Sequence, residues 1–235
     1  MTFSLIGRCE RSGMIGYAGA TSELAGGGRF PYAKAQIGSV ITQALTNPYL
    51  GHLGIKLLDL GYSPHKVLDE LVASDTHIEV RQLGVMDRFG RTAARTGKNN
   101  PDIAEHINED NLIALGNRCN EGVVTAIAEG FRESIEKDLE ERLMRAIEAG
   151  RDAGGQRDMA QNISVLKVYD RDELARVDLR VDWHEVDAIA ELRGYLDRFV
   201  PLIPYYSERP LNPTVGYREW LEARGIKYDD WLQGH

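Results

Sequence analysis

The sequence predicts an α/β protein of the α+β kind, a four-layer αββα sandwich of two mostly antiparallel sheets with helices on both outer faces. Two observations predict this fold class. The chain reads as strands, then helices, then strands, then a final helix, an order typical of two helix-covered sheets. In addition, strands and helices do not alternate regularly and no Gly-x-Gly-x-x-Gly motif opens a helix, which excludes a Rossmann fold.

The first part of the chain is predicted to form strands. Thr2–Arg8 and Met14–Ala20 flank a polar turn that ends in Gly13, a pattern typical of a β-hairpin. After the glycines at 26–28, residues Ala35–Ala44 read as a further strand.

Two short helices are predicted next. Leucines at helical spacing indicate one helix from about Leu53 to Gly61. Ser63 and Pro64 then fit the N-cap and first residue of a second helix, with Val67 and Leu71 on one face.

Further strands are predicted in the middle and late parts of the chain. Val80–Val85 and Arg91–Thr96 are expected to form a second hairpin, and Asn111–Asn117 another strand. Ile163–Tyr169 and Ala175–Val181 are expected to form a third hairpin.

The segment from Asn120 to Gly150 carries an apolar residue at every fourth position. On a helix of about 3.6 residues per turn such a stripe drifts around the axis. We therefore expect either two helices that meet near Glu133–Lys137 or one helix with different neighbours at its two ends. The charges of Glu133–Arg145 read as a solvated helix face, and Ile189–Phe199 as a final amphipathic helix.

The chain's size and charge limit what it can be. Its 235 residues make one large domain or two small ones. A net charge of -8 argues against a nucleic-acid partner and against docking on an anionic membrane. No apolar run approaches the ~20 residues that span a bilayer, and the N-terminus does not resemble a signal peptide. We expect a cytoplasmic protein.

The cysteines and histidines predict neither a metal site nor a cofactor. Cys9 and Cys119 lack metal or redox spacing and read as free thiols in a reducing cytoplasm. Cys119 could be a nucleophile, although a buried thiol is the commoner situation. The six histidines show no ligand spacing.

The most specific motifs lie between Gly38 and Gly97. They are Thr42-Gln43-Ala44-x-Thr46-Asn47-Pro48-Tyr49-x-Gly51-x-x-Gly54, Glu79-x-Arg81-Gln82-x-Gly84-Val85-x-Asp87-x-x-Gly90 and Thr96-Gly97. Gly116-Asn117, Gly154-Gly155-x-Arg157-x-x-x-Gln161 and Val177–Asp182 follow. Together they resemble the domain-of-unknown-function 1028 family. The resemblance covers residues 1–200; residues 201–235 form a Pro- and aromatic-rich tail, expected to pack on the body or on a partner subunit.

This resemblance implies an N-terminal-nucleophile (Ntn) hydrolase-like sandwich. By analogy with proteasome-type Ntn hydrolases, Thr2 would be the nucleophile once Met1 is removed, with its own α-amine as general base. Lys34 stands at the offset where those enzymes place a lysine that favours the ionised nucleophile. Lys34 is otherwise one of many surface lysines.

The sequence departs from these patterns at several positions. Where proteasome-type enzymes have an aspartate there is Ala18, and Ser22 is the candidate to supply a hydroxyl instead, unless it is only a turn residue. Within the family pattern, Arg95, Leu115 and Asn162 replace the usual His, Gln and Ser.

Other polar residues could bind substrate. Gln43, Thr46 and Asn47 precede Pro48, where a loop could offer amides to an oxyanion or simply form an Asx turn before a helix. Asn117 beside Gly116 has the same two interpretations. The alternating charges of Asp178, Arg180 and Asp182 read as structural.

Two kinds of function are compatible with these residues. The first is an amidohydrolase for a small amide or peptide-like substrate, working without cofactor. The alternative is a catalytically inactive Ntn-fold protein that binds a small ligand or serves as an oligomeric scaffold. The aromatic tail favours a homodimer or a higher homo-oligomer.

Overall fold

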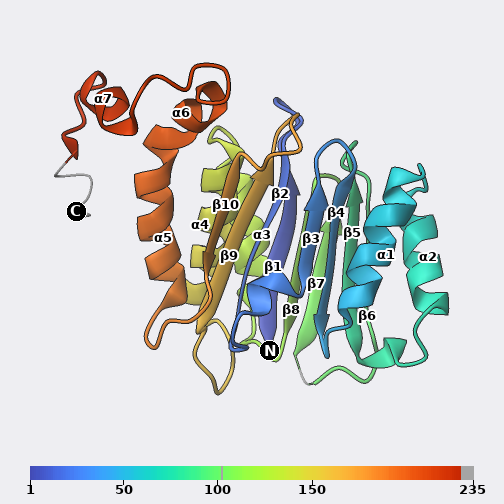
Figure 1. Ribbon diagram of the computed structural model, residues 1–235. Coiled ribbons are helices and arrows are strands. Elements are labelled where there is room, and N and C mark those ends of the chain that lie inside the picture. Colours follow the sequence, from blue (N-terminus) through green and yellow to red (C-terminus); the bar gives the residue numbers. More distant parts are fainter. Residues whose placement is uncertain (102, 229–235) are drawn as a thin grey trace.

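Two antiparallel sheets face each other in the computed structural model, which describes residues 1–101 and 103–228 (Figure 1). One sheet has six strands and the other has four. Helices α3, α4 and α5 cover the outer face of the first sheet, and α1 and α2 that of the second (Figure 1). The predicted αββα sandwich is confirmed.

The six-stranded sheet has the order β10-β9-β2-β1-β8-β7. Its strands are β1 (Thr2–Arg8), β2 (Ile15–Thr21), β7 (Ala104–Glu109), β8 (Leu112–Asn117), β9 (Ile163–Tyr169) and β10 (Val177–Val181). The first and third predicted hairpins are confirmed as β1–β2 and β9–β10. Strand β7 was not predicted, because it is a partly exposed edge strand with little apolar content.

The four-stranded sheet has the order β3-β4-β5-β6. Its strands are β3 (Pro31–Lys34), β4 (Gly38–Ala44), β5 (Arg81–Asp87) and β6 (Thr92–Thr96). The prediction of one strand over Ala35–Ala44 is wrong at its start. A turn interrupts the chain there, with positive φ at Gln36 (60°) and Gly38 (152°).

The helices confirm most of the predicted boundaries. The structure has α1 (Pro48–Asp59), α2 (Pro64–Ala73), α3 (Val123–Glu133), α4 (Leu139–Asp152), α5 (Ala188–Phe199), α6 (Ile203–Glu208) and α7 (Tyr217–Glu222). Ser63 caps α2 as expected, and the long apolar segment divides into α3 and α4. Helix α1 begins earlier than predicted, because Asn47 caps it before Pro48. Short 3-10 turns occur at Gly26–Gly28 (η1), Ile78–Val80 (η2) and Val200–Leu202 (η3).

Successive side chains of β1 point to opposite faces of the sheet, and the two faces have different surroundings. Phe3 and Leu5 pack with α3 and α4 residues in one core. Ile6 packs between the sheets in a second core, and Ser4 contacts Gln43 of the opposite sheet. The side chain of Thr2 shares this inter-sheet face.

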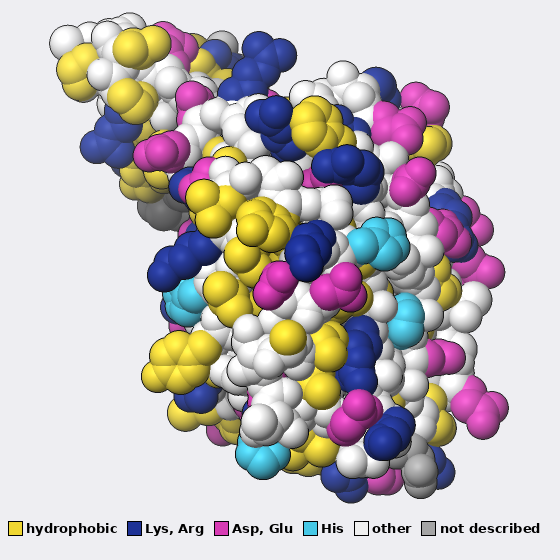
Figure 2. Space-filling view, turned by 90° about the vertical axis from the view of Figure 1, so that its right-hand side faces the viewer, with side chains coloured by type: hydrophobic (Ala, Val, Ile, Leu, Met, Phe, Trp, Pro, Cys, Tyr) yellow, Lys and Arg dark blue, Asp and Glu magenta, His cyan; other side chains and the backbone are white. Residues whose placement is uncertain are grey.

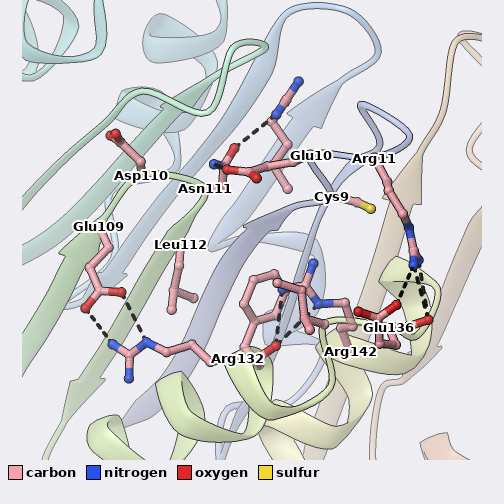
Figure 3. Close-up of a pocket in the computed structure, with 13 residues that line it drawn as sticks. Cys9, Glu10, Arg11, Glu109, Asp110, Asn111, Leu112, Arg132, Glu136 and Arg142 are labelled. Atoms are coloured by element: carbon pink, nitrogen blue, oxygen red, sulfur yellow. Dashed lines mark hydrogen bonds and ion pairs between the residues drawn. The ribbon is translucent and has the colours of Figure 1, made fainter.

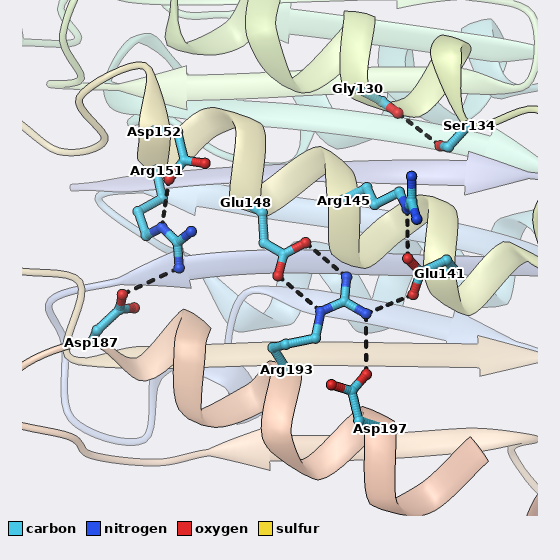
Figure 4. Close-up of polar contacts among 10 residues, drawn as sticks. All are labelled: Gly130, Ser134, Glu141, Arg145, Glu148, Arg151, Asp152, Asp187, Arg193 and Asp197. Atoms are coloured by element: carbon cyan, nitrogen blue, oxygen red, sulfur yellow. Dashed lines mark hydrogen bonds and ion pairs between the residues drawn. The ribbon is translucent and has the colours of Figure 1, made fainter. Parts of the chain in front are cut away.

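The charged face of α4 is only partly solvated, which corrects the expectation for Glu133–Arg145. Glu140 is 2% exposed and forms an ion pair with Arg176 at 3.0 Å. Arg142 is also buried and donates to the carbonyl oxygen of Phe131. Arg193 of α5 reaches two α4 carboxylates, those of Glu141 and Glu148 (Figure 4).

The described part of the tail forms a small cluster of its own beyond α5 (Figure 1). Its buried members are Leu202, Tyr205, Trp220 and Leu221. Trp231, an aromatic residue of the predicted tail, lies outside the described residues.

On the outer side of α1 and α2, charged and hydrophobic side chains are interspersed (Figure 2). Among residues 1–101 and 103–228, no helix combines the length and apolar character needed to cross a membrane.

Candidate active site at the start of β1

Thr2 is the first residue of β1, an inner strand of the six-stranded sheet. Its backbone pairs with Thr21 of β2 and with Asn117 of β8. The side chain is 5% exposed, and its hydroxyl donates a hydrogen bond to Thr21 Oγ1 at 3.1 Å. The candidate nucleophile is therefore held in one place by a second hydroxyl.

Two side chains hold the carbonyl group that is bonded to the Thr2 nitrogen. The Thr21 hydroxyl donates a short hydrogen bond to the Met1 carbonyl oxygen. Gln156 Nε2 donates to the same oxygen at 3.1 Å. Two donors converging on one carbonyl oxygen are the arrangement that stabilises negative charge on it.

Gln156 is held next to Met1 by the chain that follows α4. The preceding residues Gly154 and Gly155 have φ of 108° and 56°, conformations that favour glycine. Gln156 then forms an isolated β-bridge with Cys119. It is 4% exposed, and its Oε1 has no hydrogen-bond partner within residues 1–101 and 103–228.

Buried amides connect the two sheets beneath Thr2. Ser4 donates to Gln43 Oε1 at 2.6 Å, and Gln43 Nε2 donates to Gln82 Oε1 at 2.8 Å. Asn117 donates to the same Gln82 oxygen at 3.1 Å. Gln43 also donates to the Thr2 carbonyl oxygen at 3.4 Å. The structure thus brings three predicted site residues together: Thr2, Gln43 and Asn117.

The structure does not bring Lys34 to Thr2. Lys34 lies opposite Gly38 at the start of β4, whereas Gln43, which contacts Thr2, lies near its end. Gln43 is five positions further along β4 than Gly38, about 17 Å. Lys34 Nζ instead pairs with Asp59 at 2.7 Å, and this carboxylate raises the pKa of the lysine.

Among the described residues, none of the other predicted site residues hydrogen-bonds to the Thr2 hydroxyl. Asn47 caps α1, accepting from the Tyr49 N–H at 3.2 Å and donating to Asp75 at 3.0 Å, as in the Asx-turn interpretation. Thr46 and Ser22 are half-buried and make no side-chain hydrogen bond with the described residues. Ala18, which stands where proteasome-type enzymes have an aspartate, packs in the helix-side core. The residue paired with Thr2 on β2 is Thr21.

Cys119 borders the site but is not an activated nucleophile. Its thiol lies 3.8 Å from the Thr2 carbonyl oxygen. Burial raises the pKa of this thiol to about 12, so it stays protonated at neutral pH. Burial also lowers the pKa of the Met1 α-amine, against the opposing effects of Glu23 and Cys119.

A separate pocket of about 380 Å³ lies at the other end of β1 (Figure 3). Its charges compensate one another: Arg11 pairs with Glu136 at 3.4 Å, and Arg132 pairs with Glu109. Burial opposes ionisation of Cys9, but hydrogen bonds from Ser12 and the Arg11 backbone outweigh it and lower the thiol pKa. This pocket leaves no surplus charge for a ligand.

Sequence reasoning missed Thr21, Gln82 and Gln156. A signal existed for Thr21, because the short turn of the first hairpin fixes which residue lies opposite Thr2. For Gln82 the signal was the alternation of side chains along β5, which assigns each residue to one face of the sheet. Gln156 has none beyond the adjacent glycine pair, since its position depends on how the chain returns after α4.

Comparison with known proteins identifies the family. The model of the family of unknown function DUF1028 matches residues 2–192. The chain belongs to this family, and the tail lies outside the match. Protein SPO2555 from Silicibacter pomeroyi, a DUF1028 protein of known crystal structure, is 28% identical with a TM-score of 0.78. The similarity covers 85% of this chain and 89% of SPO2555.

Two further solved structures are more distantly similar. HslV from Trypanosoma brucei has a TM-score of 0.46 and 14% identity, covering 72% of this chain and 99% of HslV. Anbu (ancestral beta-subunit) from Yersinia bercovieri has a TM-score of 0.41 and 10% identity, covering 86% and 96%. Likenesses of this size carry no functional argument. No protein with a curated description matches the chain.

Proposed function

We propose that this member of the DUF1028 family is an N-terminal-nucleophile amidohydrolase in which Thr2 attacks a small amide or peptide-like substrate. One observation carries the proposal: Thr21 and Gln156 hold the carbonyl oxygen next to the Thr2 nitrogen, while Thr21 also accepts from the Thr2 hydroxyl. A nucleophile and a carbonyl-polarising pair therefore share one site.

Removal of Met1 would complete this site. Thr2 would then carry a free α-amine, with an ordinary pKa of about 7.7–8.0, that can accept the hydroxyl proton near neutral pH. Thr21 and Gln156 would lose the Met1 carbonyl and become available to a substrate carbonyl. We assign this role to them rather than to the Thr46–Asn47 loop, because Asn47 already caps α1.

The reaction follows from these positions. Thr2 Oγ1 bonds to the substrate carbonyl carbon, and the oxyanion accepts hydrogen bonds from Thr21 and Gln156. The C–N bond breaks, and the amine leaves with the proton that the α-amine had accepted. Water then attacks the Thr2 ester, releasing the acid and restoring the hydroxyl.

A second candidate function is a ligand-binding or scaffold protein without hydrolysis. The pairing of Lys34 with Asp59, away from Thr2, favours it, because the Lys34 ammonium then does not assist the nucleophile. The two functions differ in the fate of an amide: the hydrolase cleaves it, and the binding protein releases it unchanged.

The intact mass of protein purified from its native host is the first test. A mass without Met1 would justify screening an amide library against the wild type, Thr2→Ala and Thr2→Ser. We expect Thr2→Ala to lose activity with its fold intact and Thr2→Ser to keep part of it. Retained Met1, or full activity of Thr2→Ala on a cleaved substrate, would exclude the self-activated nucleophile.

We also propose a cytoplasmic homo-oligomer. Cys9 and Cys119 are free thiols, as a reducing compartment would keep them. The tail presents Leu211, which is 89% exposed, beside its own aromatic cluster. Deleting residues 204–235 should lower the sedimentation coefficient to that of a monomer; an unchanged association state would exclude the tail as the interface. Fractionation of native cells tests the location.

A further inference from the structure

A groove lies beside β3 because the two sheets differ in width. Strand β3 is the edge of the four-stranded sheet and contacts β2, so β9 and β10 of the six-stranded sheet extend past it. The turn η1 covers part of β2 and β9. The uncovered space is about 510 Å³. Small-molecule sites are typically about 300–1,000 Å³.

Residues from three layers line the groove. Tyr17 of β2, Lys167 of β9 and Arg180 of β10 belong to the wider sheet. Lys167 pairs in register with both Tyr17 and Asp178, so these three side chains form a row across β2, β9 and β10. Strand β3 and helix α1 form the opposite side, with Lys56 at its exposed rim.

Tyr17 lines the groove, and its hydroxyl has no partner among the described residues. The residue is 5% exposed, and its hydroxyl makes no hydrogen bond with the described residues. A hydroxyl that lines a groove and bonds to none of the described residues is available to a ligand as donor or acceptor. Burial, and next the Asp178 carboxylate, raise the pKa of Tyr17, so the hydroxyl stays neutral and can donate.

The positive charges of the groove are paired except for one. Lys56 forms no ion pair with any residue in the described ranges. The other cations have carboxylate partners, each at 2.7 Å: Lys34 with Asp59, Lys167 with Asp178, and Arg180 with Asp182. A surplus cation at the rim and an unpartnered hydroxyl inside therefore border the same space.

We propose that this groove binds a small organic anion, with its charged group at Lys56, its apolar body against Val165 and Ala33, and a polar atom hydrogen-bonded to Tyr17. The site is separate from the candidate active site. Tyr17 and Thr21 lie four residues apart on the same face of β2, about 13 Å. The proposal does not depend on any hydrolysis by Thr2.

A titration with 4-hydroxybenzoate tests the proposal. This probe has a carboxylate, a flat apolar body and a distal hydroxyl. Added to the full-length isotope-labelled protein, it should shift the amide NMR signals of groove residues, Gly27, Gly28 and Ala33 among them. Phenol, which lacks the anion, and inorganic phosphate, which lacks the body, should each bind more weakly. Absence of groove shifts, or equal binding of phosphate, would overturn the proposal.

Two variants locate the contacts. Lys56→Gln should weaken binding about tenfold, the effect of losing one charge-assisted hydrogen bond. Lys66→Gln is the matched control, because Lys66 is an exposed lysine on the neighbouring helix that pairs with Glu70. Tyr17→Phe should weaken binding without lowering the denaturation midpoint, since its hydroxyl has no partner to lose. Unchanged affinity in both groove variants would overturn the assignment.

Discussion

The Thr2 hydroxyl donates to Thr21 Oγ1 at 3.1 Å, directly across the first hairpin. Thr21 in turn donates to the Met1 carbonyl oxygen. One threonine thus links the candidate nucleophile to the carbonyl group beside it. Because both residues lie on inner strands, the surrounding sheet fixes this relationship.

The Thr21→Val variant should show what the hydrogen bonds of the Thr21 hydroxyl contribute, because it keeps the packing of the side chain. Valine has nearly the same shape but no hydroxyl, so the Thr2 hydroxyl and the Met1 carbonyl each lose a partner. We expect unfolding to become easier by about 1–2 kcal/mol. Turnover of a substrate that the wild type cleaves should fall about 100-fold or more. Thr21→Ser should retain most of both, and full activity of the valine variant would refute the role of Thr21.

Gln82→Leu should destabilise the fold strongly. Gln82 is completely buried and accepts from both Gln43 and Asn117, each of which would lose this hydrogen bond. We expect a loss of about 2–4 kcal/mol in the free energy of unfolding, measured by denaturant titration. Asn99→Leu, an exposed amide position, is the control and should change stability by no more than about 0.5 kcal/mol. Equal effects would contradict the amide network.

Arg193→Met should loosen α5 from α4. Arg193 donates to both Glu148 oxygens, at 2.8 and 2.7 Å, and to Glu141 at 2.6 Å (Figure 4). The side chain is partly buried, and we expect a loss of about 1–3 kcal/mol in thermal or chemical unfolding. Arg145→Met removes only an exposed pair one helical turn from Glu141 and should cost less than about 0.5 kcal/mol.

The same contacts predict a pH dependence. Burial opposes ionisation of Glu141, but hydrogen bonds from Arg193 and then Arg145 outweigh it and lower the pKa from its ordinary 4.5. A lowered folded-state pKa adds stability above the unfolded-state pKa. That stability disappears as the pH falls through the folded-state value. Wild type should therefore lose more stability than Arg193→Met on acidification below pH 4.5. Parallel pH profiles would contradict this.

Cys119 should resist alkylation in the folded protein. Its thiol is buried, and its pKa of about 12 leaves almost no thiolate at pH 8. Mass spectrometry after iodoacetamide treatment should find Cys119 unmodified until denaturant is added. Modification at the rate of a free thiol in native buffer would show that the start of β1 opens readily.

Local sequence patterns predicted many individual helices and strands, but they did not predict features that depend on how one element packs or pairs with another. The division between α3 and α4 was one of two interpretations of the drift of a four-residue repeat. Ser63 was identified as a cap because N-capping is local. Strand β7 was missed because its stability comes from pairing with β8 rather than from its own composition. Strand β3 was not predicted, and β4 was predicted to begin three residues too early, because a turn at Gln36 separates the two strands.

At the candidate site, too, some residues could be predicted from the sequence and others could not. Thr2 was predicted by analogy with Ntn hydrolases, and Gln43 and Asn117 as polar residues near strand ends. They lie together because alternation along the strands turns their side chains to the space between the sheets. Lys34 was chosen by its offset in sequence from Thr2. That offset has meaning only if the intervening turns match those of the proteins that suggested it, and here the lysine pairs with Asp59 instead.

The sequence by itself determined the fold class, most helices and strands, the family resemblance and the position of Thr2 at the start of a strand. These depend on periodicity and on residues close together in the chain. Only the tertiary structure decided that Thr21 and Gln156 hold the Met1 carbonyl, and that two sheets of unequal width leave a groove beside Tyr17. Such contacts join segments far apart in sequence, where packing of the whole sandwich, rather than local propensity, sets the distance.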